Sequence, residues 1–178
     1  MNMKLSRGVL LLVVLLAHTG CGYSLAGRGS FLPAYIQRIG VPQFDNTTAV
    51  FDLARIVTER VRSEFIGRGK YTIVPEATGV DAVLTGTINS VSLNPVAFNQ
   101  QNQATRYALV LTASVEFKDL RANKVLWQNN SMQYREEFTL DPTRVQETSA
   151  FLGQDVNARD RMANEFARAL VSAILEAF

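Results

Sequence analysis

Histidine and cysteine each occur only once in this 178-residue sequence, as His18 and Cys21. If the residues before Cys21 are removed, as the next paragraphs indicate, the chain keeps no histidine and no second cysteine. This excludes an intramolecular disulfide, a zinc site built from cysteine and histidine, and any nucleophilic site that depends on a histidine base. The sequence therefore predicts a protein that is not an enzyme and carries neither metal nor cofactor, apart from the covalent lipid expected on Cys21.

Long apolar runs are also missing, with one exception near the start. Residues Gly8–Ala17 are almost uninterrupted leucine and valine, and they follow the positive charges of Lys4 and Arg7. A bilayer-spanning helix needs about 20 apolar residues, and this run has roughly half as many. Its length and flanking charges are typical of the apolar core of a signal peptide.

The residues after this core indicate where the signal is cleaved. Thr19-Gly20-Cys21 matches the last three positions of a bacterial lipoprotein signal, whereas His18 stands where leucine is usual. We therefore expect residues 1–20 to be removed and the Cys21 thiol to carry diacylglycerol, which would be the only membrane attachment. Two alternatives are a buried hydrophobic helix with an incidental cysteine and a secreted protein cleaved elsewhere.

Excess positive charge is another feature that the mature chain lacks. Removing Lys4 and Arg7 lowers the Lys+Arg count from 18 to 16, which equals the 16 Asp+Glu. The basic pI of about 8.8 is thus partly a property of the signal. The composition gives no argument for nucleic acid as a partner.

What remains is long enough for one domain with its own core. Residues 21–35 are rich in glycine and serine and predict a lipidated tether, and residues 36–178 predict a single α+β domain. The hydrophobic periodicity predicts strands over 36–44, 71–74, 81–93, 107–117 and 124–138, and helices over 50–67 and 156–177. This order favours a two-layer sandwich, with two helices packed on one face of a mainly antiparallel sheet of about four strands.

Two surface segments are candidates for binding. Lys118, Arg121 and Lys124 lie near one predicted turn and have the chemistry to contact lipid or glycolipid phosphates, unless Asp119 merely balances them in a solvated turn. The amide-rich segment 94–104 suits either the polar lumen of a β-barrel or an ordinary surface loop.

Two-carboxylate chemistry, as in glycosidases, is a catalytic class that the composition does not remove. The only paired acids are Glu136 and Glu137. Neighbouring strand residues point to opposite faces, so these two are not expected to act on one substrate.

Several motifs together resemble the LPS-assembly lipoprotein LptE family. They are CGYSLAGRGSFLPAYIQRIGVPQFDNTT from Cys21, the helix FDLARIVTERVRSEF, a later TGTI strand and the strand YALVLTASVEF. The resemblance covers nearly all of the mature chain.

The resemblance implies an outer-membrane lipoprotein with two helices on a four-stranded sheet, facing the periplasm and the barrel lumen. It implies that the protein plugs the LptD-type β-barrel, assists its assembly, and supports lipopolysaccharide transport to the outer leaflet. Lipopolysaccharide is then the expected ligand of Lys118, Arg121 and Lys124. An alternative is a lipoprotein of a secretion pore or an activator of a peptidoglycan synthase, because the segment RGKYTIV at Arg68–Val74 is similar to a strand of those proteins.

Overall fold

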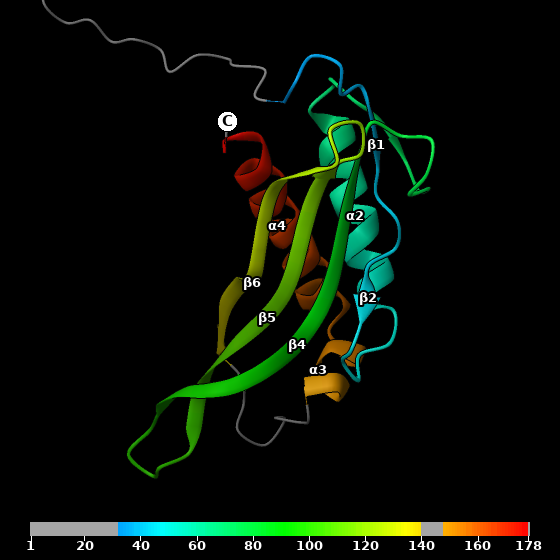
Figure 1. The fold of residues 1–178 in the computed structure, drawn as a ribbon. Coiled ribbons are helices and arrows are strands. Elements are labelled where there is room, and N and C mark those ends of the chain that lie inside the picture. Colours follow the sequence, from blue (N-terminus) through cyan, green and yellow to red (C-terminus); the bar gives the residue numbers. More distant parts are fainter. Residues whose placement is uncertain (1–31, 140–147, 178) are drawn as a thin grey trace, which may run out of the picture.

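The computed structural model describes residues 32–139 and 148–177. A sheet and three helices make up this part of the chain (Figure 1). In chain order the elements are β1 (Arg38–Gly40), β2 (Asp45–Asn46), α2 (Leu53–Gly67), β3 (Thr72–Val74), β4 (Ala82–Phe98), β5 (Ala104–Asp119), β6 (Lys124–Thr139), α3 (Thr148–Gln154) and α4 (Val156–Leu175).

Strand β5 is the middle of the long antiparallel part of the sheet. It pairs with β4 on one side and with β6 on the other over most of its length. Its odd-numbered side chains from Tyr107 to Phe117 are all buried, while Thr112, Ser114 and Glu116 between them are half-exposed. The predicted alternation and the predicted hairpin of β5 with β6 are both confirmed.

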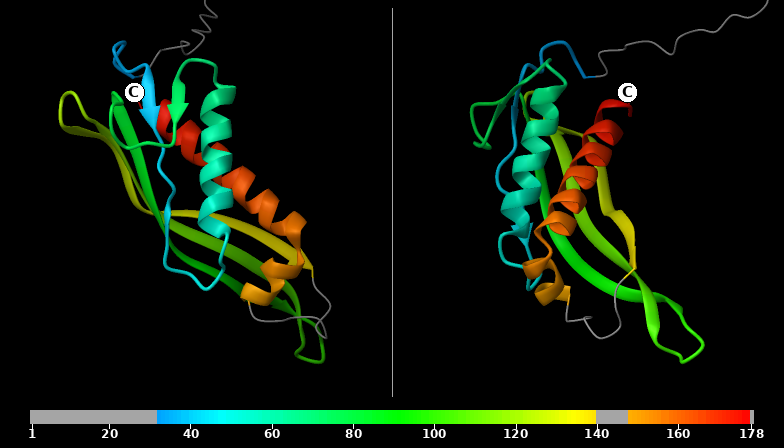
Figure 2. Two further views of the ribbon diagram at one scale, coloured as in Figure 1. Left: turned by 90° about the vertical axis from the view of Figure 1, so that its right-hand side faces the viewer. Right: turned by 180° about the vertical axis from the view of Figure 1, so that it is seen from behind.

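Helices α2 and α4 cover only one face of this sheet, as the two further views show (Figure 2). The two helices contact each other, and each turns an apolar stripe toward the strands. Phe65 of α2, Phe117 of β5 and Phe166 of α4 are among the largest fully buried side chains. The other residues of α2 and α4 in this core are Leu53, Ala54, Ile56, Val57, Val61, Met162, Ala163, Ala167, Leu170, Val171 and Ile174.

The α+β class is confirmed, but the sheet is larger than the expected four strands and is not purely antiparallel. The sheet has six strands, in the order β3-β1-β4-β5-β6, with β2 also paired to β4. The pairs β1–β3, β1–β4 and β2–β4 are parallel. Parallel pairing arises because helix α2 serves as a crossover, which returns the chain so that β3 runs beside β1 in the same direction.

Of the predicted first strand, 36–44, only β1 forms, and a gap separates it from β2, which begins at Asp45, beyond the predicted end. Pro42 lies in the gap and has no N–H to donate to the neighbouring strand. Helix α2 provides partners instead: Arg62 Nε donates to the Val41 carbonyl at 2.8 Å, and the Phe44 N–H donates to Thr58 Oγ1 at 3.0 Å. The interrupted strand is thus held by side chains of the helix above it.

Two further elements differ from the prediction. Strand β4 continues beyond Leu93 to Phe98, because register shifts on either side of Ala97 accommodate Pro95. Only residues 99–103 connect it to β5, and this hairpin extends past the helices (Figure 2). Helix α3 was not expected, but its Leu152 is fully buried.

Replacing Gly86 with alanine should destabilise the fold, because this position of β4 lies directly against a buried ring. A Cβ there would come within 2.6 Å of the Phe44 side chain. We expect Gly86→Ala to lower the free energy of unfolding by about 1–3 kcal/mol, measured by urea denaturation. Gly67→Ala is the matched control, since no atom lies within 4 Å of its Cβ position. An equal loss of stability in the two variants would contradict this explanation.

Candidate functional site

The sheet face opposite the helices is uncovered and lined mainly by uncharged polar side chains. Since α2 and α4 pack on the other face, alternate residues of β4, β5 and β6 are left accessible. Hydroxyls and amides predominate along it: Thr85, Thr87, Thr112, Ser114, Gln128, Asn130 and Gln133. We call this uncovered face of β4, β5 and β6 the open face.

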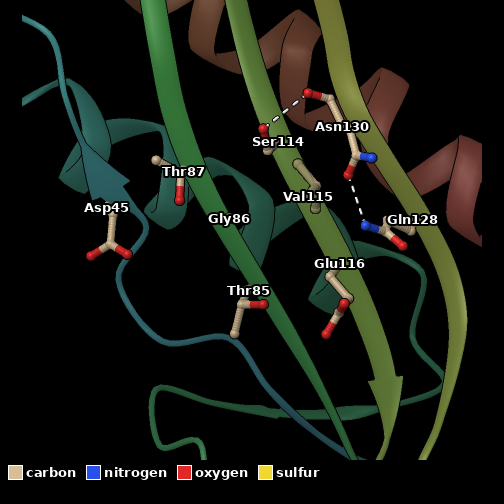
Figure 3. A pocket seen from close by; sticks show the side chains of 9 residues that line it. All are labelled: Asp45, Thr85, Gly86, Thr87, Ser114, Val115, Glu116, Gln128 and Asn130. Carbon is tan, nitrogen blue, oxygen red and sulfur yellow. Dashed lines mark hydrogen bonds between the residues drawn. The ribbon is translucent and has the colours of Figure 1, made fainter.

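A hollow of about 290 Å³ lies in the open face, between β2 and β6 (Figure 3). The Ser114 hydroxyl bridges strands here: it accepts from Asn89 Nδ2 at 2.6 Å and donates to the Asn130 carbonyl at 2.9 Å. Gln128 Nε2 donates to Asn130 Oδ1 at 2.7 Å. Asp45 and Glu116 supply the carboxylates of the hollow. Its groups suit hydrogen bonding to a polar surface.

No metal-binding set stands out in the part of the chain that the structure describes. Within residues 32–139 and 148–177, no group of three His, Cys, Asp or Glu residues could hold a metal ion. Nor does any helix in these ranges have the length and apolar character needed to cross a membrane.

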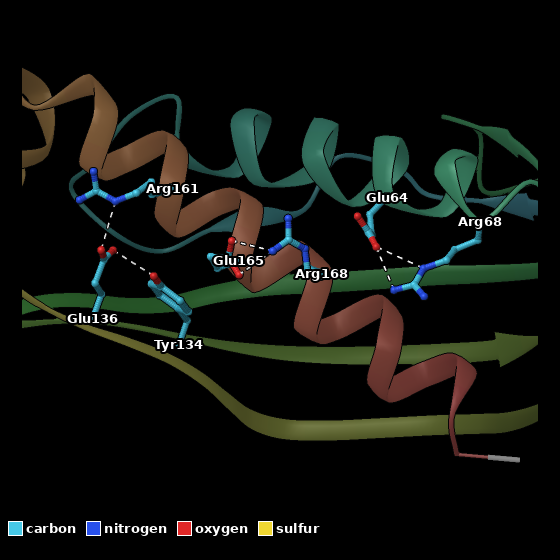
Figure 4. A network of polar contacts seen from close by, with 7 residues as sticks. All are labelled: Glu64, Arg68, Tyr134, Glu136, Arg161, Glu165 and Arg168. Carbon is cyan, nitrogen blue, oxygen red and sulfur yellow. Dashed lines mark hydrogen bonds and ion pairs between the residues drawn. The ribbon is translucent and has the colours of Figure 1, made fainter. Parts of the chain in front are cut away.

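Glu136 and Glu137 lie on opposite faces, as predicted, and serve different contacts. Glu136 faces the helices, where it accepts from Arg161 of α4 at 3.1 Å and from the Tyr134 hydroxyl at 3.0 Å (Figure 4). Glu137 lies on the open face and pairs with Arg106 at 3.4 Å and Arg135 at 3.2 Å. The two acids therefore cannot form one catalytic pair.

The contacts of Glu136 fasten α4 to the edge strand β6. The Arg161 guanidinium also lies over the Phe138 ring, 5.3 Å from its centroid. Burial and the neighbouring Glu136 carboxylate raise the pKa of Tyr134, so the phenol stays a hydrogen-bond donor. A second polar link joins the two long helices. Arg68, the residue that follows α2, contacts Glu64 of α2 and also Ser172 of α4. These groups have structural roles.

Lys118, Arg121 and Lys124 do lie together, at the turn between β5 and β6. Arg121 is ion-paired with Asp81 at 2.5 Å, and its guanidinium lies 5.5 Å from the centroid of the Tyr35 ring. Among the ion pairs of the described residues, none involves Lys118 or Lys124. That these three residues contact lipopolysaccharide stays a prediction.

Two buried aspartates organise this turn, and sequence reasoning had not selected Asp81. Asp81 accepts from the backbone N–H groups of Gln37 and Arg38, each at 2.9 Å. Asp119 accepts from the backbone N–H groups of Arg121 and Ala122 at 2.8 and 3.0 Å, and from the Tyr35 hydroxyl. These two aspartates join segments that are far apart in the sequence, so no local sequence pattern predicts their contacts.

Both aspartates are held in the ionised form. Backbone hydrogen bonds from Arg38 and Gln37 lower the pKa of Asp81. Burial works against ionisation of Asp119, but the hydrogen bonds from Tyr35 and from the turn backbone outweigh it and lower the pKa of Asp119. The turn therefore has its negative charge inside and its positive charge outside.

The comparisons with known proteins agree with the architecture described above. The family model LptE, described as lipopolysaccharide-assembly, matches residues 36–174. The chain belongs to the LptE family. The match extends from the residues before β1 into the last turn of α4, so it includes the whole sheet and both long helices. A search of curated protein sequences finds no significant match.

Solved structures share the fold at low sequence identity. Lipoprotein B from Nitrosomonas europaea is 13% identical, with a TM-score of 0.51, and the match covers 88% of this chain and 96% of that one. The hypothetical protein CT253 from Chlamydia trachomatis is 10% identical, with a TM-score of 0.53 and coverage of 80% and 99%. A minor lipoprotein from Acinetobacter baumannii is 12% identical, with a TM-score of 0.50 and coverage of 82% and 95%. At these identities the likeness shows the fold alone.

Cys21, the predicted lipidation site, lies outside the described residues, and so does the predicted signal, 1–20. Part of the predicted tether 21–35 is described: Leu32 is buried in the core, and Tyr35 contacts Asp119. The chain therefore enters the fold beside the turn of β5 and β6.

Replacing Asp119 with asparagine should weaken this end of the domain and change its acid sensitivity. The folded-state pKa lies below the unfolded value of about 3.9, so the carboxylate stabilises the fold above that pH and loses this effect as pH falls through the folded pKa. We expect Asp119→Asn to lower the free energy of unfolding at pH 7 by about 1–3 kcal/mol. The further loss below about pH 4 should be smaller than in the parent chain.

Urea denaturation of the mature protein at neutral and acidic pH measures both effects. Asp45→Asn is the matched control, because Asp45 is an exposed aspartate of β2. If the two variants lose stability equally, Asp119 does not organise the turn.

Proposed function

We propose that this protein is an outer-membrane lipoprotein that plugs an LptD-type β-barrel and assists its assembly. In this role it supports the transport of lipopolysaccharide to the outer leaflet without catalysing a reaction. The observation that carries the proposal is the match to the LptE family over residues 36–174. The protein is anchored by lipid on Cys21 and faces the periplasm and the barrel lumen.

The open face supports the barrel as a partner. The lumen of a large β-barrel is polar and wet, so a surface that enters it needs hydrogen-bonding groups more than apolar area. The open face offers hydroxyls and amides on three long adjacent strands, and two of its cations, Arg106 and Arg135, are paired with Glu137. Such a surface is compatible with water before assembly and with a polar wall after it.

Purification of the lipidated protein from detergent-solubilised outer membranes tests the role as a plug. We expect a large β-barrel to co-purify in a fixed ratio, identified by mass spectrometry. A lipidated protein that comes down without a barrel would end the proposal. Cys21→Ser should abolish the lipid on the amino-terminal peptide and release the protein from the membrane fraction, because no other attachment is proposed.

A charge placed on the open face should disrupt the complex. Ser114→Arg puts a bulky guanidinium into the hollow at the centre of β5, where docking would remove it from water. We expect about a tenfold or greater loss of co-purified barrel, since each 1.4 kcal/mol of lost binding is worth a factor of about ten. Ser63→Arg is the matched control, because Ser63 is an exposed serine of α2 on the helical side. Equal recovery of the barrel with both variants would exclude the open face as the contact.

A further inference from the structure

The turn between β5 and β6 lies at the end of the domain where the chain enters from Cys21. Leu32 is the first described residue, and Tyr35 follows it with its hydroxyl bonded to Asp119 and its ring beneath Arg121. Figures 1 and 2 show the turn, the first described residues and the carboxyl terminus at this same end. We call residues 118–125 the anchor-side turn.

The lipid-bearing residue is a short distance away along the chain. Leu32 is eleven positions after Cys21 in the sequence. A chain of that length reaches at most about 40 Å when fully extended. The lipid therefore holds this end of the domain within the reach of the tether from its leaflet.

The anchor-side turn presents positive charge to the outside. Lys118 is half-exposed and Lys124 is exposed, and the Arg121 side chain is 60% exposed although it is paired. Asp119, the acid of the turn, is only 1% exposed, and Asp81, the partner of Arg121, is 9% exposed. A surface that approaches the turn meets the cations first.

Apolar side chains accompany these cations. Leu120 is 38% exposed and Val125 is 40% exposed, and Tyr35 beside them is 40% exposed. Basic residues with exposed apolar and tyrosine side chains suit the headgroup region of an anionic bilayer, because both kinds of contact are available there. The opposite end differs, since residues 82–105, which include the β4–β5 connection, contain no charged residue.

We infer that the anchor-side turn docks on the phosphates of anionic phospholipids in the leaflet that holds the Cys21 lipid. This assigns Lys118, Arg121 and Lys124 to phospholipid instead of lipopolysaccharide. The inference rests on the lipid anchor of the proposed function, but it does not depend on the barrel.

Fluorescence quenching on vesicles tests the inference with the full mature chain lipidated at Cys21. Because the acylated Cys21 has no free thiol, Ala122→Cys introduces the only labelling site, in the exposed turn. The labelled protein is reconstituted into phosphatidylethanolamine vesicles with phosphatidylglycerol, with lipopolysaccharide or with neither, and a headgroup-attached quencher reports proximity. We expect quenching that requires phosphatidylglycerol and declines with salt. A label at Gln101→Cys, in the connection at the other end, should stay unquenched.

Removing the charges should release the turn without unfolding it. Each basic residue near an anionic surface changes binding by about fivefold, so K118Q/K124Q should lower the ratio of docked to free turn by about 25-fold. The double variant keeps Arg121 and its contact with Asp81. R106Q/R135Q is the matched control, because it removes two cations from the same strands at their other end. This control should leave the quenching unchanged.

Several results would overturn the inference. They are no quenching at position 122, equal quenching at position 101, quenching that needs lipopolysaccharide in the vesicles, and no effect of K118Q/K124Q. An amino-terminal peptide without lipid would overturn it together with the proposed anchor. Quenching at position 122 without a co-purifying barrel supports the docking of the turn and ends the plug role. A co-purifying barrel without quenching supports the plug role and ends the docking of the turn.

Discussion

The structure depends on the one-sided burial of β5. Every second side chain of this strand is covered by α2 and α4, and the residues between them have no element above them. Burial of large apolar side chains such as Phe117 and Leu111 stabilises the sheet from one side only, at roughly 1.5–3 kcal/mol for each fully buried side chain. The other side is free to carry polar groups, so the same strand serves stability on one face and recognition on the other.

Polar contacts of the described residues mostly fasten elements together around this core. Arg161 and Glu136 hold α4 to β6, Arg68 links α2 to Ser172 of α4, and Asp119 ties Tyr35 to the turn. Most of these groups are partly exposed, and such pairs contribute little each. The buried Asp119 is different, because removing its charge would leave several donors without their partner.

The sequence was most informative where one face of an element is buried. The alternation from Tyr107 to Phe117 and the helical spacing from Leu53 to Phe65 predicted β5 and α2, because burial imposes those periods. The short parallel strands β1 and β3 have no such period, since three residues show no alternation. Their pairing depends on the crossover by α2, which is a tertiary contact.

Long-range polar contacts were the other feature that sequence reasoning could not supply. Lys118, Arg121 and Lys124 could be grouped because they are close in the sequence. Asp81 could not be added to them, because it precedes Arg121 by 40 residues and meets it only after β4 and β5 have paired. The polar positions of β5 could have indicated the open face from the sequence. The hollow could not be predicted in the same way, because it depends on the register of three strands.

The dimensions of the sheet reconcile the two proposals. β4 has 17 residues, so it spans at most about 56 Å from Ala82 at the anchor-side end to Phe98. A bilayer with its headgroup regions is about 40–45 Å thick. With the basic turn at the headgroups of the leaflet that holds Cys21, a sheet aligned with the barrel axis would extend through the lumen to the level of the opposite leaflet. The cations would then meet lipid phosphates, while the uncharged hairpin and the open face would meet the barrel wall.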